Sequence, residues 1–121
     1  MKRFYKTVSV TAERGILLDA RPVRTPRKAL LSLPTNALAE AIADEWRAQA
    51  CEIKPETMKL TGLANAAIDL IAPDPLAFAT GLAAYGESDL LCYRADEPPE
   101  LVARQLTAWE PLLEWAQTRY D

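Results

Sequence analysis

The sequence predicts an α+β fold, in which a small antiparallel sheet with a covering helix forms a two-layer sandwich and a helical domain follows. Short segments rich in β-branched and aromatic residues alternate with turn residues up to residue 33. Residues 35–51 then show apolar positions four apart, which is typical of a helix. After residue 58 the pattern is wholly helical. We therefore predict an N-terminal α+β domain at 1–58 and the start of a helical domain at 59–121.

Three strands are expected in the first domain. Residues 4–10 form the first, and residues 16–20 return as the second after a turn in which Gly15 is free to adopt positive φ. Prolines at 22 and 26 disfavour a helix and hold the next segment extended. Residues 29–33 are the third predicted strand.

The covering helix is predicted from Thr35, which can cap it, to near Cys51. Leu38, Ile42 and Trp46 lie on one face of this helix, so they are expected in the core against the sheet. Burying an indole contributes about 2–3 kcal/mol, so Trp46→Arg should unfold or seriously weaken the domain.

Three further helices are predicted. Apolar residues from Leu60 to Ile71 have amphipathic spacing, and a second helix runs from Pro75 to about Tyr85, where Gly86 stops it. The last helix begins at Glu100, with Trp109 on its apolar stripe and in the predicted core. Trp115 lies off that stripe, which favours it as a surface residue.

Composition argues against catalysis. The 121 residues include no histidine, so the commonest general base and metal ligand is missing, and the four glycines form no phosphate-binding loop. We predict a protein that is not an enzyme and needs no cofactor or metal. Cys51 and Cys92 are expected to be free thiols, and their spacing does not show whether they are neighbours. No apolar run reaches the ~20 residues that span a bilayer, so no stable membrane insertion is expected.

Charge is distributed unevenly. Residues 1–30 carry eight basic and two acidic side chains, a net +6, so with −3 for the whole chain residues 31–121 carry −9. A basic segment of this kind can bind nucleic acid, and that is the alternative function. The other interpretation is a solvated strand face, because only Phe4 and Tyr5 offer base stacking. Clustering of Arg21, Arg24, Arg27 and Lys28 on one face would favour nucleic acid.

Residues 85–94, Tyr-Gly-Glu-Ser-Asp-Leu-Leu-Cys-Tyr-Arg, hold the most unusual grouping. Glu87 and Asp89 are the one close carboxylate pair beside apolar residues that merits consideration for acid–base chemistry. With Arg94 they are candidates for a small hydrolase site, for a capped turn with an ion pair, or for partner binding. Leu90, Leu91 and Tyr93 either join a core or border a groove for an apolar segment of a partner. We assign the partner-binding role to Glu87, Asp89, Leu90, Leu91, Tyr93, Arg94 and Trp115.

This segment, the opening Arg3-Phe-Tyr-Lys-Thr-Val, Ala43-Asp-Glu-Trp46, and residues 106–115 together resemble the Atp12 family, assembly chaperones of the F1 sector of ATP synthase. The resemblance implies a chaperone that binds the unassembled α subunit of F1 and shields its apolar interface until the β subunit replaces it. It also implies an α/β domain followed by a helical domain. Since family members continue past this point, the helical domain is expected to be truncated here. We expect a monomer in the bacterial cytoplasm, for which the mitochondrial matrix would be the eukaryotic equivalent.

Overall fold

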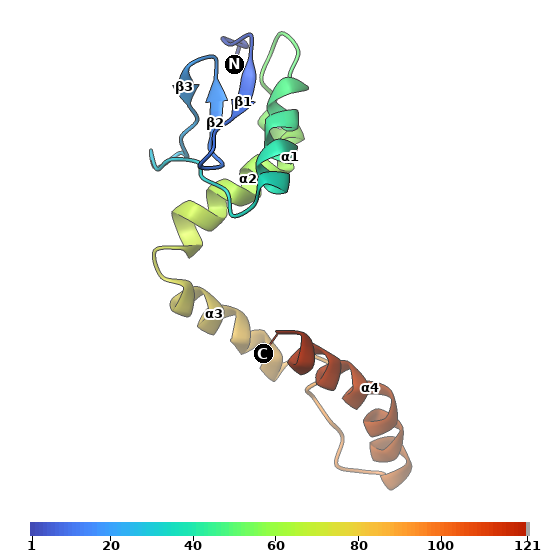
Figure 1. Ribbon diagram of the computed structural model, residues 1–121. Coiled ribbons are helices and arrows are strands. Elements are labelled where there is room, and N and C mark those ends of the chain that lie inside the picture. The colour runs from blue at the N-terminus through green and yellow to red at the C-terminus, as the bar shows by residue number, and fades with distance from the viewer. Residues whose placement is uncertain (121) are drawn as a thin grey trace. The chain divides into compact units, whose positions relative to one another are not determined.

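The computed structural model describes residues 1–120, which form two compact units, Met1–Pro75 and a second unit that begins at Leu76 (Figure 1). The first unit contains the sheet and helices α1 and α2, and the second contains most of α3 and all of α4. The α+β class predicted from the sequence is confirmed. The predicted division after residue 58 stays a prediction about folding units.

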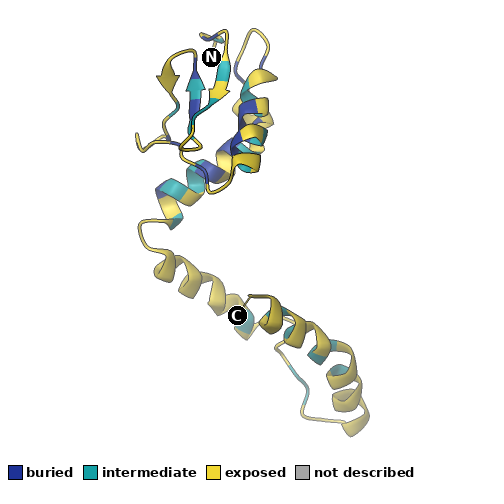
Figure 2. Ribbon diagram, viewed as in Figure 1, coloured by how far each residue is buried: buried dark blue, intermediate teal, exposed yellow. Residues whose placement is uncertain are grey.

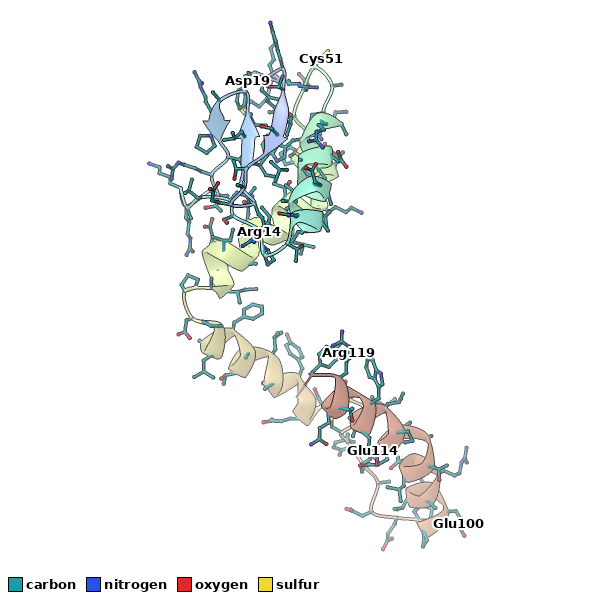
Figure 3. All side chains as sticks on the ribbon, in the orientation of Figure 1. Arg14, Asp19, Cys51, Glu100, Glu114 and Arg119 are labelled. Carbon is teal, nitrogen blue, oxygen red and sulfur yellow. The ribbon has the colours of Figure 1, made fainter. Side chains whose placement is uncertain are left out.

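Three short strands form the antiparallel sheet, in the order β1 (Val8–Val10), β2 (Ile16–Leu18) and β3 (Arg21–Pro22). The register pairs Val10 with Ile16 and Leu18 with both Val8 and Arg21. Figure 3 labels Arg14 and Asp19 at the two ends of β2, and both have positive φ, at 60° and 54°. The expected positive φ at Gly15 is wrong, because no glycine of the described chain has one.

The third strand differs from the prediction. Residues 29–33 form no strand, and their backbone pairing is limited to the isolated bridges Arg24↔Leu30 and Gly15↔Ser32. Arg21–Pro22 is the third strand instead, since the left-handed backbone at Asp19 turns the chain back onto β2 at once. Leu31 and Leu33 still point into the core, at 1% and 3% exposure.

Helix α1 (Asn36–Arg47) covers one face of the sheet (Figure 2). It begins as predicted, with the Thr35 hydroxyl accepting from Leu38 N at 3.2 Å. It ends at Arg47 rather than near Cys51, because the Gln49 side chain turns back and its Nε2 donates to the Glu45 carbonyl at 3.0 Å. The inward face of the helix consists of Ala39, Ile42 and Ala43, all fully buried.

The core of the first unit has two clusters. One comprises Ile16, Leu31, Leu33, Ala39, Ile42, Ala43 and Ala64, with Leu38 packed against it. The other comprises Tyr5, Leu18, Ile53 and Met58. Trp46 packs against both clusters, and the Tyr5 hydroxyl donates to its carbonyl at 2.7 Å. Its indole nitrogen has no hydrogen-bond partner in the described chain.

A 3₁₀ turn, η1 (Pro55–Thr57), leads into α2 (Lys59–Ala66), which continues as a π-helical segment, η2 (Ala67–Ile71). The N-cap residue of α2, Met58, has no side-chain acceptor. The carboxylate of Glu45 in α1 replaces it, accepting from Leu60 N at 2.7 Å and from Thr61 N at 2.8 Å. One helix therefore caps the next, and this contact joins α2 to α1 within the first unit.

The regular structure of the second unit is helical among residues 76–120. It comprises α3 (Pro75–Ala83), a 3₁₀ turn, η3 (Ala84–Glu87), a loop, and α4 (Pro99–Tyr120). None of residues 76–120 is buried (Figure 2). Among residues 1–120 no single helix is long and apolar enough to cross a membrane, and only stretches 59–71 and 75–87, as a bent pair, have the length and composition.

Candidate functional site

The segment that follows η3 is a turn held by Asp89. The Asp89 side chain accepts from Leu91 N at 2.9 Å. The backbone carbonyl of Asp89 accepts from Cys92 N at 3.0 Å and from Tyr93 N at 2.8 Å. A short side chain that accepts from the backbone two residues on is characteristic of an Asx turn. Asp89 thus has a structural task, while the neighbouring Glu87 is exposed.

Arg94 joins this turn to α4. Its Nε donates to the Leu91 carbonyl at 2.6 Å, and its terminal nitrogen pairs with the Glu110 carboxylate at 3.2 Å. The guanidinium also lies 5.5 Å from the centre of the half-buried Trp109 ring. Within the described chain Arg94 forms no ion pair with Glu87 or Asp89, so the three groups do not converge as a hydrolytic site requires.

The second unit exposes large apolar side chains, in this turn and on α4. Leu90 is 69% exposed, Tyr93 74% and Trp115 59%, whereas Leu91 is half-buried. Trp115 packs edge-on against Tyr120, with ring centres 5.9 Å apart. Tyrosine and tryptophan are enriched at the energetic centres of protein interfaces, so this surface fits a protein partner better than a reacting small molecule.

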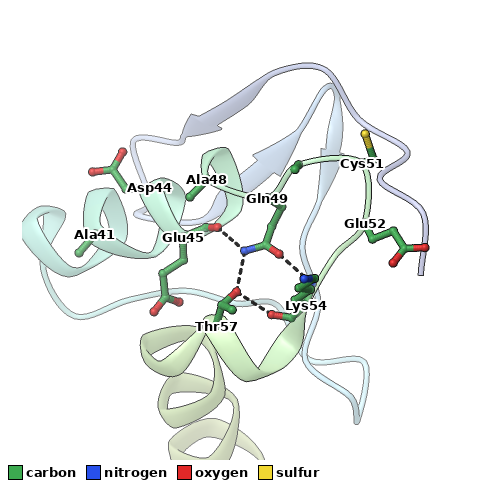
Figure 4. Close-up of a pocket in the computed structure, with 10 residues that line it drawn as sticks. Ala41, Asp44, Glu45, Ala48, Gln49, Cys51, Glu52, Lys54 and Thr57 are labelled. Atoms are coloured by element: carbon green, nitrogen blue, oxygen red, sulfur yellow. Dashed lines mark hydrogen bonds between the residues drawn. The ribbon is translucent and has the colours of Figure 1, made fainter.

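A cavity of about 820 Å³ lies at the C-terminal end of α1, and its lining includes Asp44, Glu45, Cys51, Glu52 and Lys54 (Figure 4). Its polar groups are engaged in holding the fold. Gln49 donates to the Thr57 hydroxyl at 3.1 Å and accepts from Lys54 N at 2.8 Å.

Neither the side chains that line this cavity nor the two thiols indicate a metal site. Cys51 and Cys92 are free and exposed. Among residues 1–120 no three His, Cys, Asp or Glu side chains lie close enough to hold a metal ion.

Four of the eight basic residues in residues 1–30 lie on one hairpin. Arg21, Arg24, Arg27 and Lys28 are all exposed, on β3 and the turn that follows it. This clustering is what a nucleic-acid site requires. Of the two aromatic residues available for base stacking, however, Tyr5 is only 4% exposed.

Two acids with structural roles were missed at the sequence level, the buried Asp69 and the half-buried Glu45. Asp69, 7% exposed, accepts from Thr25 Oγ1 at 2.7 Å and Arg27 N at 3.0 Å, and Glu45 caps α2. The available signal for Asp69 was a lone acid inside the apolar run Ala67-Ile-Asp-Leu-Ile. Such an acid requires a partner when it is buried.

Comparison with known proteins gives consistent matches. The family model described as ATP12 chaperone protein matches residues 2–117. The crystal structure of Atp12 from Paracoccus denitrificans is similar at a TM-score of 0.77 and 49% identity, over 98% of this chain and 52% of that chain. A point mutant of the same protein has a TM-score of 0.75 and 50% identity, over 97% of this chain and 51% of that chain.

The Atu1473 protein of Agrobacterium tumefaciens is also similar, with a TM-score of 0.69 and 48% identity. That similarity covers 95% of this chain and 44% of the other. The chain therefore spans about half the length of the solved structures that it matches.

Proposed function

Because this chain belongs to the ATP12 chaperone protein family, we propose that it acts in ATP synthase assembly, as a chaperone and not as an enzyme. Its client is the unassembled α subunit of the F1 sector. It shields the apolar interface of that subunit until the β subunit replaces it. The place of action is the bacterial cytoplasm, and the chaperone acts as a monomer.

The observation that carries the proposal, beside family membership, is the exposed apolar surface of the second unit. Leu90 and Tyr93 are exposed in the same short segment as Glu87 and Arg94, and Trp115 is exposed on α4. An apolar centre with a polar rim is the usual anatomy of a protein interface. Large aromatic side chains bury much area at low entropic cost, which suits reversible capture.

Such a chaperone binds the free subunit and not the assembled ring, where its binding surface is covered. No nucleotide hydrolysis is needed, because competition by the β subunit releases the client. The acidic remainder of the chain, −9 over residues 31–121, opposes self-association.

The test uses purified F1 α subunit, β subunit and assembled ring, each passed over the immobilised chain. We expect retention of free α subunit, and its release when β subunit is added. Tyr93→Ser should weaken retention severalfold. Tyr85→Ser is the matched control, because Tyr85 is 73% exposed against 74% for Tyr93 but belongs to no proposed contact.

Equal retention of α and β subunits, or of the assembled ring, would refute the proposed client. Equal losses for the two tyrosine variants would refute the proposed surface while leaving the client intact.

A further inference from the structure

The basic hairpin is fixed by a buried carboxylate. Asp69 lies in the π-helical segment η2, a feature often found at functional sites. Its two oxygens accept from Thr25 Oγ1 at 2.7 Å and from Arg27 N at 3.0 Å, while its carbonyl accepts from the Arg27 guanidinium at 2.7 Å. Thr25 is itself 4% exposed and accepts from Ala29 N at 3.1 Å. The turn is therefore held in one conformation before any partner arrives.

This anchored turn carries four basic side chains against the single Asp69 carboxylate that holds it. Arg21, Arg24, Arg27 and Lys28 are exposed, and none forms an ion pair with a carboxylate of the described chain. The Arg24 guanidinium instead donates to the Lys28 carbonyl at 2.8 Å, which brings two cationic residues together. Four like charges on one hairpin repel each other, so an anionic partner is favoured there.

An apolar pocket adjoins the same hairpin. It has a volume of about 370 Å³, and Val23, Arg24, Thr25 and Pro26 form one of its walls. The lining also includes the buried Ile53 and Met58, together with Trp46 and, from α2, Gly62. Arg24 is the one lining residue with a charged side chain, and Met1, which also lines the pocket, carries the α-amino group of the chain. A recess of this kind accepts an apolar side chain and disfavours a basic one.

We propose that the hairpin and the pocket together bind an extended acidic segment of a protein partner. One apolar side chain of that segment enters the pocket, and flanking carboxylates pair with Arg24, Arg27 and Lys28. The inference rests on the proposed chaperone function, for which it supplies a second contact surface, in the first unit. Nucleic acid is disfavoured because Tyr5 is buried, and a lipid surface because the apolar part is a recess.

The probe is a fluorescently labelled peptide in which glutamates flank a central leucine, and its binding to the full chain is followed by anisotropy. Arg24→Glu combined with Lys28→Glu should weaken binding about tenfold, since two exposed attractions become repulsions. The matched control is Lys59→Glu with Arg104→Glu, which changes net charge equally at exposed positions outside the hairpin. This control should bind within about twofold of the parent chain.

The pocket is tested separately with Gly62→Leu. A Cβ atom at Gly62 would meet no atom within 4 Å, so the branch point of the new side chain has room, and the rest of it should narrow the pocket that Gly62 lines. Gly81→Leu, at an equally open position in α3, is its control. We expect weaker peptide binding only for Gly62→Leu. Replacing the central leucine of the peptide by serine should have a comparable effect.

Three outcomes would overturn the inference. They are equal losses for the hairpin and control charge variants, unaltered binding in Gly62→Leu, and stronger hairpin-dependent binding of single-stranded oligonucleotide or phosphatidylserine vesicles than of the peptide. The proposed function has its own assay, so its failure can be distinguished from the failure of this inference. Capture of the F1 α subunit by the parent chain is measured independently of peptide binding.

Discussion

The capping of α2 by Glu45 gives a sharp test of how the first unit is held together. The Glu45 carboxylate accepts from Leu60 N at 2.7 Å, from Thr61 N at 2.8 Å and from Thr61 Oγ1 at 2.8 Å. Met58, at the N-cap position, supplies no side-chain acceptor. Glu45→Ala therefore leaves two first-turn amides without their acceptor.

The expected loss can be estimated from these contacts. A helix cap contributes about 0.5–2 kcal/mol, and a carboxylate near the N-terminus adds about 0.3–1 kcal/mol from the helix dipole. Hydrogen bonds to charged groups contribute about 1.5–3 kcal/mol, partly the same energy. We expect Glu45→Ala to lower the free energy of unfolding by about 2–3 kcal/mol. Glu45→Gln, which keeps one acceptor oxygen, should lose about half as much.

Two measurements check this estimate. Urea unfolding followed by circular dichroism gives the free energy, and hydrogen exchange of the Leu60 and Thr61 amides reports the cap directly. Glu40→Ala is the control, since Glu40 pairs only with the exposed Arg47 at 3.0 Å and should cost at most about 0.5 kcal/mol. Equal losses for Glu45→Ala and Glu40→Ala, or unaltered exchange at Leu60, would refute the capping argument.

Three further outcomes are expected. Ile42→Ala opens a cavity at a fully buried position and should lower the free energy of unfolding by about 2–5 kcal/mol in urea titrations. Hydrogen bonds from the backbone N–H groups of Thr7 and Lys6 lower the pKa of Asp19 below its ordinary 3.8. The contribution of Asp19 to folding stability is therefore present above that pH and is lost as the pH falls through the folded-state pKa. Asp19→Asn, which tolerates the positive φ, should therefore lower the thermal midpoint near neutral pH but not in strong acid, and an equal loss at every pH would contradict this. Gly62→Ala should raise stability by about 0.5–1 kcal/mol, because its Cβ meets open space in a helix, and a lower thermal midpoint would contradict this.

Local patterns in the sequence were sufficient for the α+β class, the start of α1 at its Thr35 cap, and membership of the Atp12 family. Each depends on residues close together in the chain. The third strand was misplaced because a hairpin turn of non-glycine residues with positive φ has a weak signature. Residues 29–33 resemble a strand because Leu31 and Leu33 alternate with outward residues and are buried, although the backbone of that segment forms only isolated bridges.

The contacts that build the candidate sites could not be predicted in this way. Asp69 meets Thr25 across 44 residues, and Glu45 meets Thr61 across 16. Periodicity places a residue on a face of its own helix but does not identify a partner in another element. Asp69 in fact interrupts an apolar run, so its position became meaningful only when the fold brought Thr25 and Arg27 to it.

The two units distribute burial very differently, and this bears on how a partner would be held. Every buried side chain of residues 1–120 lies in the first unit, where Asp69 and Glu45 tie loops and helices into one framework. In the second unit the apolar side chains, among them Tyr93 and Trp115, are exposed or half-buried. A preorganised surface binds with little ordering cost and favours specificity, whereas exposed aromatic groups supply apolar area. A chaperone that uses both surfaces can select its client through the hairpin and shield it with the helical unit.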